Sequence, residues 1–175
     1  MFIKPAVNNK TMPSKILLPP QYEDTLEGSL IFLAGPIQGN WDWQSAAIKY
    51  FQKNSPEINI ASPRRNDESW KFNYNEQVDW ETFHLNQAAE EGVILFWMAK
   101  ETEHDCGRAY AQTTRFEFAE WKTKYQVDEI KIAVGIEEGF TGAKYIRRRM
   151  SQDCPEITIC NSLEETCGRA VELLN

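Results

Sequence analysis

The chain has 175 residues, of which 42% are hydrophobic and 12% aromatic, and its formal net charge is −7. This size and composition predict a single globular domain rather than a disordered chain. The acidic balance argues against a nucleic-acid polymer as partner, because binding to a phosphate backbone requires clustered positive charge. A local basic site remains compatible with binding of one small phosphate.

Signals for secretion, membrane insertion and metal binding are not found in the sequence. The first residues soon turn polar and proline-bearing, unlike a signal peptide, and no apolar stretch approaches the roughly 20 residues of a membrane helix. The four cysteines form no CxxC pair, and His104 with Cys106 supplies too few ligands for a metal site. We therefore expect a cytoplasmic protein with reduced thiols, no cofactor, no bound metal and no membrane partner.

Along the chain, an extended N-terminal arm is expected first, because residues 1–28 contain four prolines and no sustained hydrophobic period. From residue 29 to residue 175, short apolar runs alternate with helical patterns, which predicts one domain. The expected strands are 30–34, 58–61, 93–97, 130–136 and 157–160. The expected helices are about 40–53, 75–90, one carrying Glu117 and ending near 125, 141–151, and a last one through 174 with a capping box at Asn161-Ser162 and Glu165.

The order of these elements predicts an α/β fold. Five short, nearly continuous apolar strands separated by helices are typical of a parallel sheet covered on both faces, a three-layer sandwich. A flavodoxin-like strand order, 2-1-3-4-5, brings together the loops after the first and third strands, where such sheets bind ligands. The sequence has no GxGxxG and no GxxxxGK[ST] motif, which argues against a dinucleotide site and a P-loop.

The loop after the first strand is the first candidate for ligand binding. Residues 34–40 run Ala-Gly-Pro-Ile-Gln-Gly-Asn and lead into a helix, so their backbone N–H groups favour a phosphate, a hydroxyl or another polar group. Gly35, Pro36 and Ile37 are the candidate residues. Alternatively, Gly35 and Pro36 only turn the chain.

The helix expected at 75–90 carries most of the candidate acids. At about 100° per residue, its sheet-facing stripe consists of Val78, Thr82, Leu85 and Ala89. One flank then carries Gln77, Glu81 and His84, and the other carries Asp79. Trp80 and Phe83 point away from this stripe, so either a second subunit or the N-terminal arm covers them.

Glu117 is the candidate nucleophile, because it lies near the start of the helix that follows the third apolar strand. The expected core stripe of this helix is Ala111, Thr114, Phe118, Trp121 and Tyr125, so Glu117 lies just off the core. A carboxylate there can face the crevice at the carboxyl ends of the strands. The competing interpretation is a capping box, because Thr114-x-x-Glu117 has its spacing.

Five segments between about residues 30 and 136 carry a resemblance to a known family: 31–37, 62–65, Gln77-x-x-Trp80-Glu81, 93–97 and 115–121. In order and spacing they resemble the nucleoside 2-deoxyribosyltransferase-like family. The resemblance implies a flavodoxin-like fold and a dimer or higher homo-oligomer, often with a neighbouring subunit completing the pocket. It also implies cleavage of the N-glycosidic bond of 2′-deoxynucleosides by a glutamate at the position of Glu117.

The resemblance assigns roles to further residues. The best-characterised members carry an aspartate where this chain has His84, and another acidic residue where it has Ala111. Glu81 and His84 are therefore the candidates for handling the proton of the base, with Asp79 as the alternative. The expected substrate-binding residues, some for a phosphate if the substrate is a nucleotide, are Gly35, Pro36, Ile37, Arg65, Asp79, Trp97 and Arg108.

Three functions follow as expectations. In the first, Glu117 forms a glycosyl ester with the sugar, and a second base attacks it, which gives net transfer. With water as the acceptor, the protein is instead a hydrolase of a nucleoside, a nucleotide or another N-riboside. The third is a non-catalytic nucleotide-binding module on the same scaffold.

Overall fold

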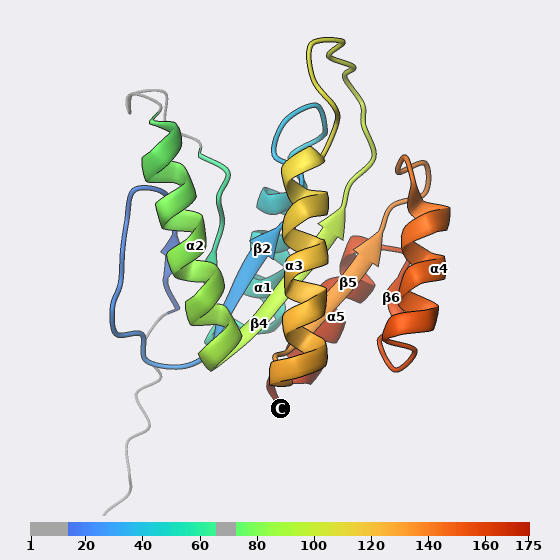
Figure 1. Cartoon of the computed structure of the whole chain (residues 1–175). Coiled ribbons are helices and arrows are strands. Elements are labelled where there is room, and N and C mark those ends of the chain that lie inside the picture. The colour runs from blue at the N-terminus through green and yellow to red at the C-terminus, as the bar shows by residue number, and fades with distance from the viewer. Residues whose placement is uncertain (1–13, 66–72) are drawn as a thin grey trace, which may run out of the picture.

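The computed structural model describes residues 14–65 and 73–175. Its centre is a sheet of six parallel strands between two layers of helices (Figure 1). The strands are β1 (Ile16–Leu17), β2 (Leu30–Ala34), β3 (Asn59–Ala61), β4 (Gly92–Met98), β5 (Ile132–Ile136) and β6 (Ile159–Cys160). Their spatial order is β1-β3-β2-β4-β5-β6. The predicted α/β sandwich is confirmed.

The structure adds one strand to the prediction. Strands β2 to β6 are the five expected ones, and their spatial order is the expected 2-1-3-4-5. The additional strand, β1, comes from the segment that the prolines mark as an arm, and it pairs with β3 through Ile16↔Ile60. Its two residues are too few to show a hydrophobic period. Of the expected arm, residues 1–13 lie outside the described residues.

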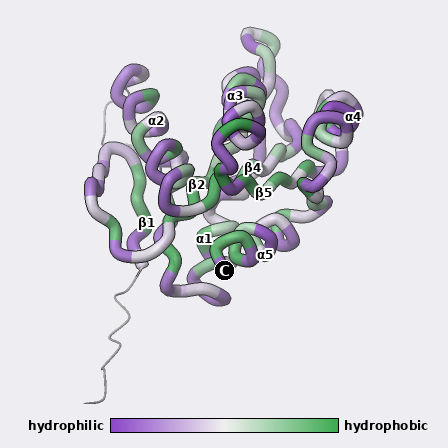
Figure 2. Tube along the Cα trace, turned by 60° about the horizontal axis from the view of Figure 1, so that its bottom comes forward, coloured by the Kyte–Doolittle hydropathy of each residue, from purple (hydrophilic) through white to green (hydrophobic). Residues whose placement is uncertain are grey.

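The helices are α1 (Trp43–Asn54), α2 (Tyr74–Glu91), α3 (Gln112–Asp128), α4 (Ala143–Asp153) and α5 (Leu163–Leu174). Helices α2, α3 and α4 cover one face of the sheet, and α1 and α5 cover the other (Figures 1 and 2). Side chains of a strand alternate between these faces. In β4, Phe96 packs on the α2/α3 side, whereas Leu95 and Trp97 pack on the α1/α5 side.

Two predicted helix starts have different outcomes. The capping box of α5 is confirmed, because Ser162 Oγ accepts from the Glu165 N–H at 3.2 Å and Glu165 Oε2 accepts from the Ser162 N–H at 3.3 Å. The start of α1 is corrected, because Asp42 rather than Asn40 is its N-cap. Asn40 instead donates its side-chain amide to the Pro36 carbonyl oxygen at 2.9 Å.

The predicted buried face of α2 is wrong by about one residue of rotation. Its buried residues are Gln77, Trp80, His84, Leu85 and Ala88, and of the predicted stripe only Leu85 is among them. Trp80 packs on Phe32 of the sheet, and its Nε1 donates to the Gln21 carbonyl oxygen at 2.6 Å. Tyr22 contacts Phe83. The segment before β2 thus covers the apolar side of α2 that the helical period left without a partner.

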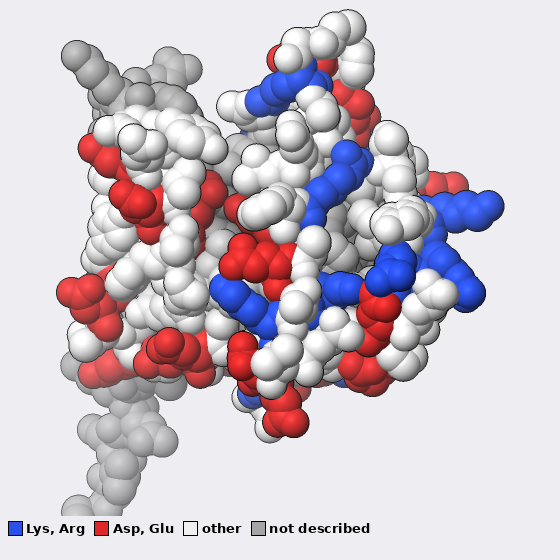
Figure 3. Space-filling view, viewed as in Figure 1, with Lys and Arg blue, Asp and Glu red and all other residues white. Residues whose placement is uncertain are grey.

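The described residues also bear on the expectations about membrane helices, metal ligands, cysteines and surface charge. Within residues 14–65 and 73–175, no helix has the length and apolarity to cross a membrane, and no group of three or more potential metal ligands occurs. All four cysteines are described and free. Lysine and arginine side chains gather over α4, whereas the outer surface of α2 is acidic (Figure 3).

Candidate active site

A cavity of about 670 Å³ opens at the carboxyl ends of β2 and β3, between α2 and α3. Four segments of the described chain line it. They are the end of β2 with its loop (Phe32, Ala34, Gly35, Pro36, Ile37, Gln38), the loop after β3 (Pro63, Arg65), α2 (Tyr74, Gln77, Val78, Glu81), and the start of α3 with the preceding loop (Arg108, Ala109, Ala111, Gln112, Thr113, Thr114, Glu117). This is the switch point where parallel sheets of this order bind ligands.

Gly35 shapes the wall of the cavity at the end of β2. Its φ is +157°, and a Cβ built on it would lie 2.3 Å from the Trp97 carbonyl oxygen and 2.7 Å from the Trp43 ring. Only glycine fits at this contact between the β2 and β4 backbones. The loop leaves the sheet here, so that Pro36 and Ile37 face the cavity.

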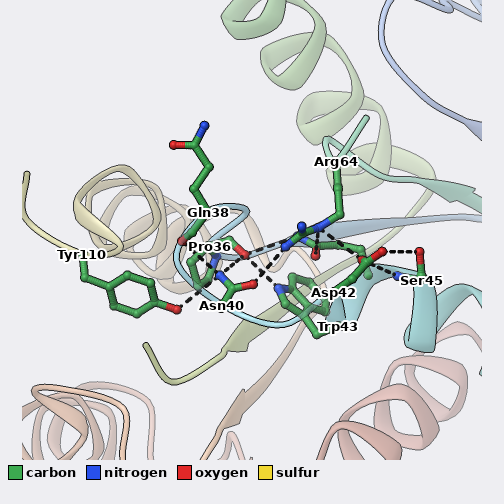
Figure 4. Close-up of polar contacts among 9 residues, drawn as sticks. Pro36, Gln38, Asn40, Asp42, Trp43, Ser45, Arg64 and Tyr110 are labelled. Carbon is green, nitrogen blue, oxygen red and sulfur yellow. Dashed lines mark hydrogen bonds and ion pairs between the residues drawn. The ribbon is translucent and has the colours of Figure 1, made fainter. Parts of the chain in front are cut away.

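Arg64 holds the same loop from outside the cavity (Figure 4). Its Nη2 donates to Asn40 Oδ1 at 2.9 Å, and its Nε donates to Gln44 Oε1 at 2.8 Å and lies 3.2 Å from Asp42 Oδ1. Asn40 in turn donates to the Pro36 carbonyl oxygen and to the Tyr110 hydroxyl oxygen. The network joins the loops after β2, β3 and β4, which makes the wall rigid.

Glu117 lies in the second turn of α3 and lines the cavity. The capping-box interpretation is excluded, because α3 starts after Ala111, its N-cap, and Thr114 is buried inside the helix. Among the described residues, no hydrogen bond to the Glu117 carboxyl group is found. Burial, then the negative charges of Glu81 and Glu120, raises the pKa of Glu117 to about 8. A carboxyl group is thus held free in a cavity.

Glu81 faces the same cavity from α2. Its Oε1 accepts a hydrogen bond of 2.6 Å from Gln77 Nε2. Burial raises the pKa of Glu81, while the bond from Gln77 and the positive charge of Arg65 oppose that rise. The charge of Glu81 is in turn one cause of the raised pKa of Glu117, which places the two carboxyl groups within electrostatic reach. They form a pair in which ionisation of one disfavours ionisation of the other.

Polar and aromatic groups surround this pair at the mouth of the cavity. Arg65 and Arg108 both line it. Arg108 donates through Nη1 to Gln38 Oε1, and its Nε lies 3.5 Å from Asp105 Oδ2. The exposed ring of Tyr74 lies on the α2 side. The first turn of α3 has no side-chain cap, so its N–H groups remain available to polar atoms of a ligand.

Seven of the predicted site residues meet at this cavity, and three do not. Glu117, Glu81, Gly35, Pro36, Ile37, Arg65 and Arg108 line it. His84 is fully buried, its ring lies 4.2 Å from that of Trp80, and its Nδ1 donates to the Trp80 carbonyl oxygen at 3.0 Å. Burial lowers the pKa of His84, which favours the neutral ring. His84 is a core histidine and does not line the cavity.

The other two residues, Asp79 and Trp97, lie on sides of their elements that do not line the cavity. Asp79 is exposed on the outer surface of α2, about 200° around the helix from Glu81, and is not among the lining residues. Trp97 packs on the α1/α5 face of the sheet, whereas the cavity lies on the opposite face. The alternation of β4 therefore prevents Trp97 from touching a ligand there.

Sequence reasoning missed the role of Gln77 and of Arg64. The helical period places Gln77 on the same flank as Glu81. It does not predict that Gln77 is only 7% exposed or that it makes two hydrogen bonds, because both depend on the loop after β3. The signal in the sequence was the i, i+4 spacing of Gln77 and Glu81. For Arg64 no signal distinguishes it from its neighbour Arg65, because only the fold decides which of the two turns toward Asn40.

Comparison with known proteins gives one family. The family described as nucleoside 2-deoxyribosyltransferase like matches residues 28–139, which include β2 to β5 and every segment that lines the cavity. No curated protein matches the chain significantly.

Proposed function

The chain belongs to the nucleoside 2-deoxyribosyltransferase-like family, and we propose that it cleaves or transfers the N-glycosidic bond of a 2′-deoxynucleoside or deoxynucleotide. Glu117 is the proposed nucleophile, and Glu81 is the proposed acid and base. The supporting observation concerns the Glu117 carboxyl group. It lines a cavity of about 670 Å³, it does not cap its own helix, and it lies within electrostatic reach of the Glu81 carboxyl group.

In the first step, a Glu117 carboxylate oxygen bonds to C1′ of the sugar while the bond from C1′ to the base nitrogen breaks. The base leaves with the electron pair of that bond and takes a proton from Glu81, now a carboxylate. In the second step, a nitrogen of another base attacks C1′, Glu117 leaves as a carboxylate, and Glu81 takes back a proton. With water in place of the second base, the product is the free sugar.

This route needs one proton on the pair, and it needs that proton on Glu81. The pKa of Glu117, about 8, favours the proton on Glu117 instead. The two arrangements have the same net charge, so both are present whenever the pair holds one proton. The positive charge that develops on the sugar in the transition state favours an ionised Glu117.

Further parts of the proposal concern the partners. Arg65 and Arg108 stand at the mouth of the cavity, where they suit the 5′-phosphate of a nucleotide. The family resemblance supports a homodimer or a higher homo-oligomer. The proposed ligand is a small molecule, and the net charge of −7 opposes a nucleic-acid polymer.

A panel of nucleosides, 2′-deoxynucleosides and 5′-monophosphates tests the proposal, each incubated with the protein with and without a second free base. Release of the base in a chromatographic assay is the expected result. Exchange into the second base identifies a transferase, and release that ignores it identifies a hydrolase. Mass spectrometry of the quenched protein is expected to show the added sugar on Glu117. Ligand-induced thermal stabilisation without any base release would instead favour a nucleotide-binding module.

A further inference from the structure

Gln77 makes two hydrogen bonds through its single side-chain nitrogen. It lies one helical turn before Glu81 and is only 7% exposed. Its Nε2 donates to the Pro63 carbonyl oxygen at 3.1 Å and to Glu81 Oε1 at 2.6 Å. An amide nitrogen carries two hydrogens, so both are used. The side chain therefore connects Glu81 to the loop that follows β3.

The orientation of this amide is fixed by its backbone partner. The Pro63 carbonyl oxygen can only accept a hydrogen bond. If the amide of Gln77 were reversed, its Oε1 would face that oxygen, and two acceptors would meet in a buried place at a large cost in free energy. The nitrogen of Gln77 therefore faces Glu81 in every protonation state of Glu81.

This orientation decides which oxygen of Glu81 can carry a proton. Oε1 receives a hydrogen from Gln77, so a proton on the same oxygen would face a donor. The remaining oxygen, Oε2, is the one that can hold the proton. We propose that Gln77 is a positioning residue, which keeps the transferable proton of Glu81 on Oε2 and holds that carboxyl group in place for protonation of the leaving base. The inference rests on the proposed function.

A positioning role differs from simple tuning of acidity. The groups that face Glu81 are Gln77 on its own helix, Arg65 after β3 and Glu117 on α3. The bond from Gln77 lowers the pKa of Glu81, so loss of that bond raises the pKa and leaves Glu81 protonated to a higher pH. If only acidity mattered, such a change would preserve or widen the pH range of protonation. If position matters, the rate falls although the proton is present.

The test replaces Gln77 by methionine, which has a similar length and no donor. The matched control is Gln87→Met, because Gln87 also lies on α2, donates through Nε2 to a backbone carbonyl (Glu23, 3.0 Å), and has a buried Oε1 without a partner in the described structure. Gln87 does not line the cavity. Both variants lose a comparable bond to another segment, so a general loss of stability affects both.

Two substrates separate the protonation of the base from the rest of the reaction. The natural probe is the 2′-deoxynucleoside that wild type cleaves fastest, and the second is 4-nitrophenyl 2-deoxyribofuranoside, whose leaving group departs without protonation. We expect Gln77→Met to slow the natural substrate about 10- to 100-fold in kcat, part of the roughly 10²–10⁴-fold that general acid catalysis supplies. The nitrophenyl substrate is expected to change less than threefold, and Gln87→Met is expected to change neither.

A carbon-13 NMR titration of glutamate side chains gives a second measurement that needs no turnover. We expect the Glu81 carboxyl resonance of Gln77→Met to titrate at higher pH than in wild type and in Gln87→Met. Equal slowing of both substrates in Gln77→Met overturns the positioning role. An unchanged Glu81 titration also overturns it, and this measurement applies even where release of 4-nitrophenol is too slow to measure. Absence of base release by wild type itself is a different result, which refutes the proposed function and with it the inference. Should Gln77→Met not fold, Gln77→Leu takes its place in both measurements.

Discussion

The two faces of the sheet are covered in different ways. On one face, α1 and α5 contact each other and close a continuous apolar layer over Leu33, Leu95 and Ala133. On the other face, α2 and α3 leave a cavity of about 670 Å³ between them at the carboxyl ends of β2 and β3. The same strands serve both sides, because their residues alternate. What differs is the spacing of the helices, and it decides where a ligand fits.

This difference between the two faces shows where the fold can remove water from a charged side chain. The α1/α5 face encloses apolar side chains and the buried thiol of Cys167, whose pKa is raised to about 12, first by burial and then by the negative charge of Glu164. The cavity face holds Glu81 and Glu117, both with a pKa raised by burial. A carboxyl group can be partly dehydrated in an open cavity without being buried in the core, which is the environment that activates acids and nucleophiles.

The largest effect is expected from Glu117→Gln, which removes the proposed nucleophile and keeps the size of the side chain. We expect base release to fall on the order of 10³-fold or more, as is found for loss of a catalytic nucleophile. The matched control is Glu120→Gln, one turn further along α3 and exposed. Glu120→Gln is expected to keep at least half of the activity. If Glu117→Gln retains base release, Glu117 is not the nucleophile.

The next effect concerns stability as a function of pH. The pKa of Glu117 in the folded chain, about 8, lies above that of an unfolded glutamate. The group therefore contributes its full stability below the unfolded pKa, and that contribution is lost as the pH rises through about 8. The loss is on the order of 2–4 kcal/mol.

Urea unfolding at pH 5 and pH 9 measures this loss. Wild type is expected to lose stability relative to Glu117→Gln between the two values, because glutamine does not ionise. A constant difference between the two proteins across this range would show that Glu117 is solvated in the cavity, and the electrostatic contrast between the two faces would then disappear.

How far the sequence predicts this molecule depends on the range of the interactions involved. The capping box of α5 was predicted correctly because Ser162 and Glu165 lie within one turn. The strand order, and the position of Glu117 on the helix after the third apolar strand, were predicted from short segments in a fixed order. The buried face of α2 was not, because Trp80 donates to the Gln21 carbonyl oxygen and Phe83 contacts Tyr22, both some 60 positions earlier in the chain.

The candidate site shows the same limit. A glutamate after the third apolar strand is visible in the sequence, and so is a second acid at Glu81. Whether His84 or Glu81 faces the cavity depends on a rotation of α2 by less than one turn, which the arm and the sheet decide together. The hydrogen bond from Gln77 to the Pro63 carbonyl oxygen depends on where the loop after β3 lies. The hydrophobic period of the sequence contains no information on the position of that loop.

A smaller effect is expected from two glycine substitutions, one in the cavity wall at the end of β2 and one inside α5. Gly35→Ala places a Cβ 2.3 Å from the Trp97 carbonyl oxygen, so we expect a loss of roughly 1–3 kcal/mol in the free energy of unfolding. Gly168→Ala, inside α5, meets only Tyr50 Oη at 3.4 Å. It is expected to gain about 0.5–1 kcal/mol from helix propensity.

Chemical denaturation of the two variants checks this contrast, and the base-release assay adds a second difference. Gly35→Ala is expected to impair base release beyond its loss of stability, because Gly35 shapes the cavity wall. Gly168→Ala is expected to leave base release unchanged. Equal tolerance of both substitutions would show that the wall at β2 is adjustable, contrary to the close approach of β2 and β4.

The smallest effect tests whether the rate follows the ionisation of Glu117. The charge of Glu120 contributes to the raised pKa of Glu117, after burial and after Glu81. In Glu120→Gln, the rising limb of kcat/KM against pH is therefore expected to move toward lower pH, by roughly half a unit or less, because an exposed charge is screened by water and salt. The substitution also removes an exposed ion pair with Lys124, which contributes under about 0.5 kcal/mol to stability.

Salt offers an internal control for Glu120→Gln. The shift of the limb between the two proteins should shrink as ionic strength rises, since a screened charge acts over a shorter distance. A limb that does not move at low salt would mean that the rate depends on another titrating group, and Glu81 would then be the group to examine.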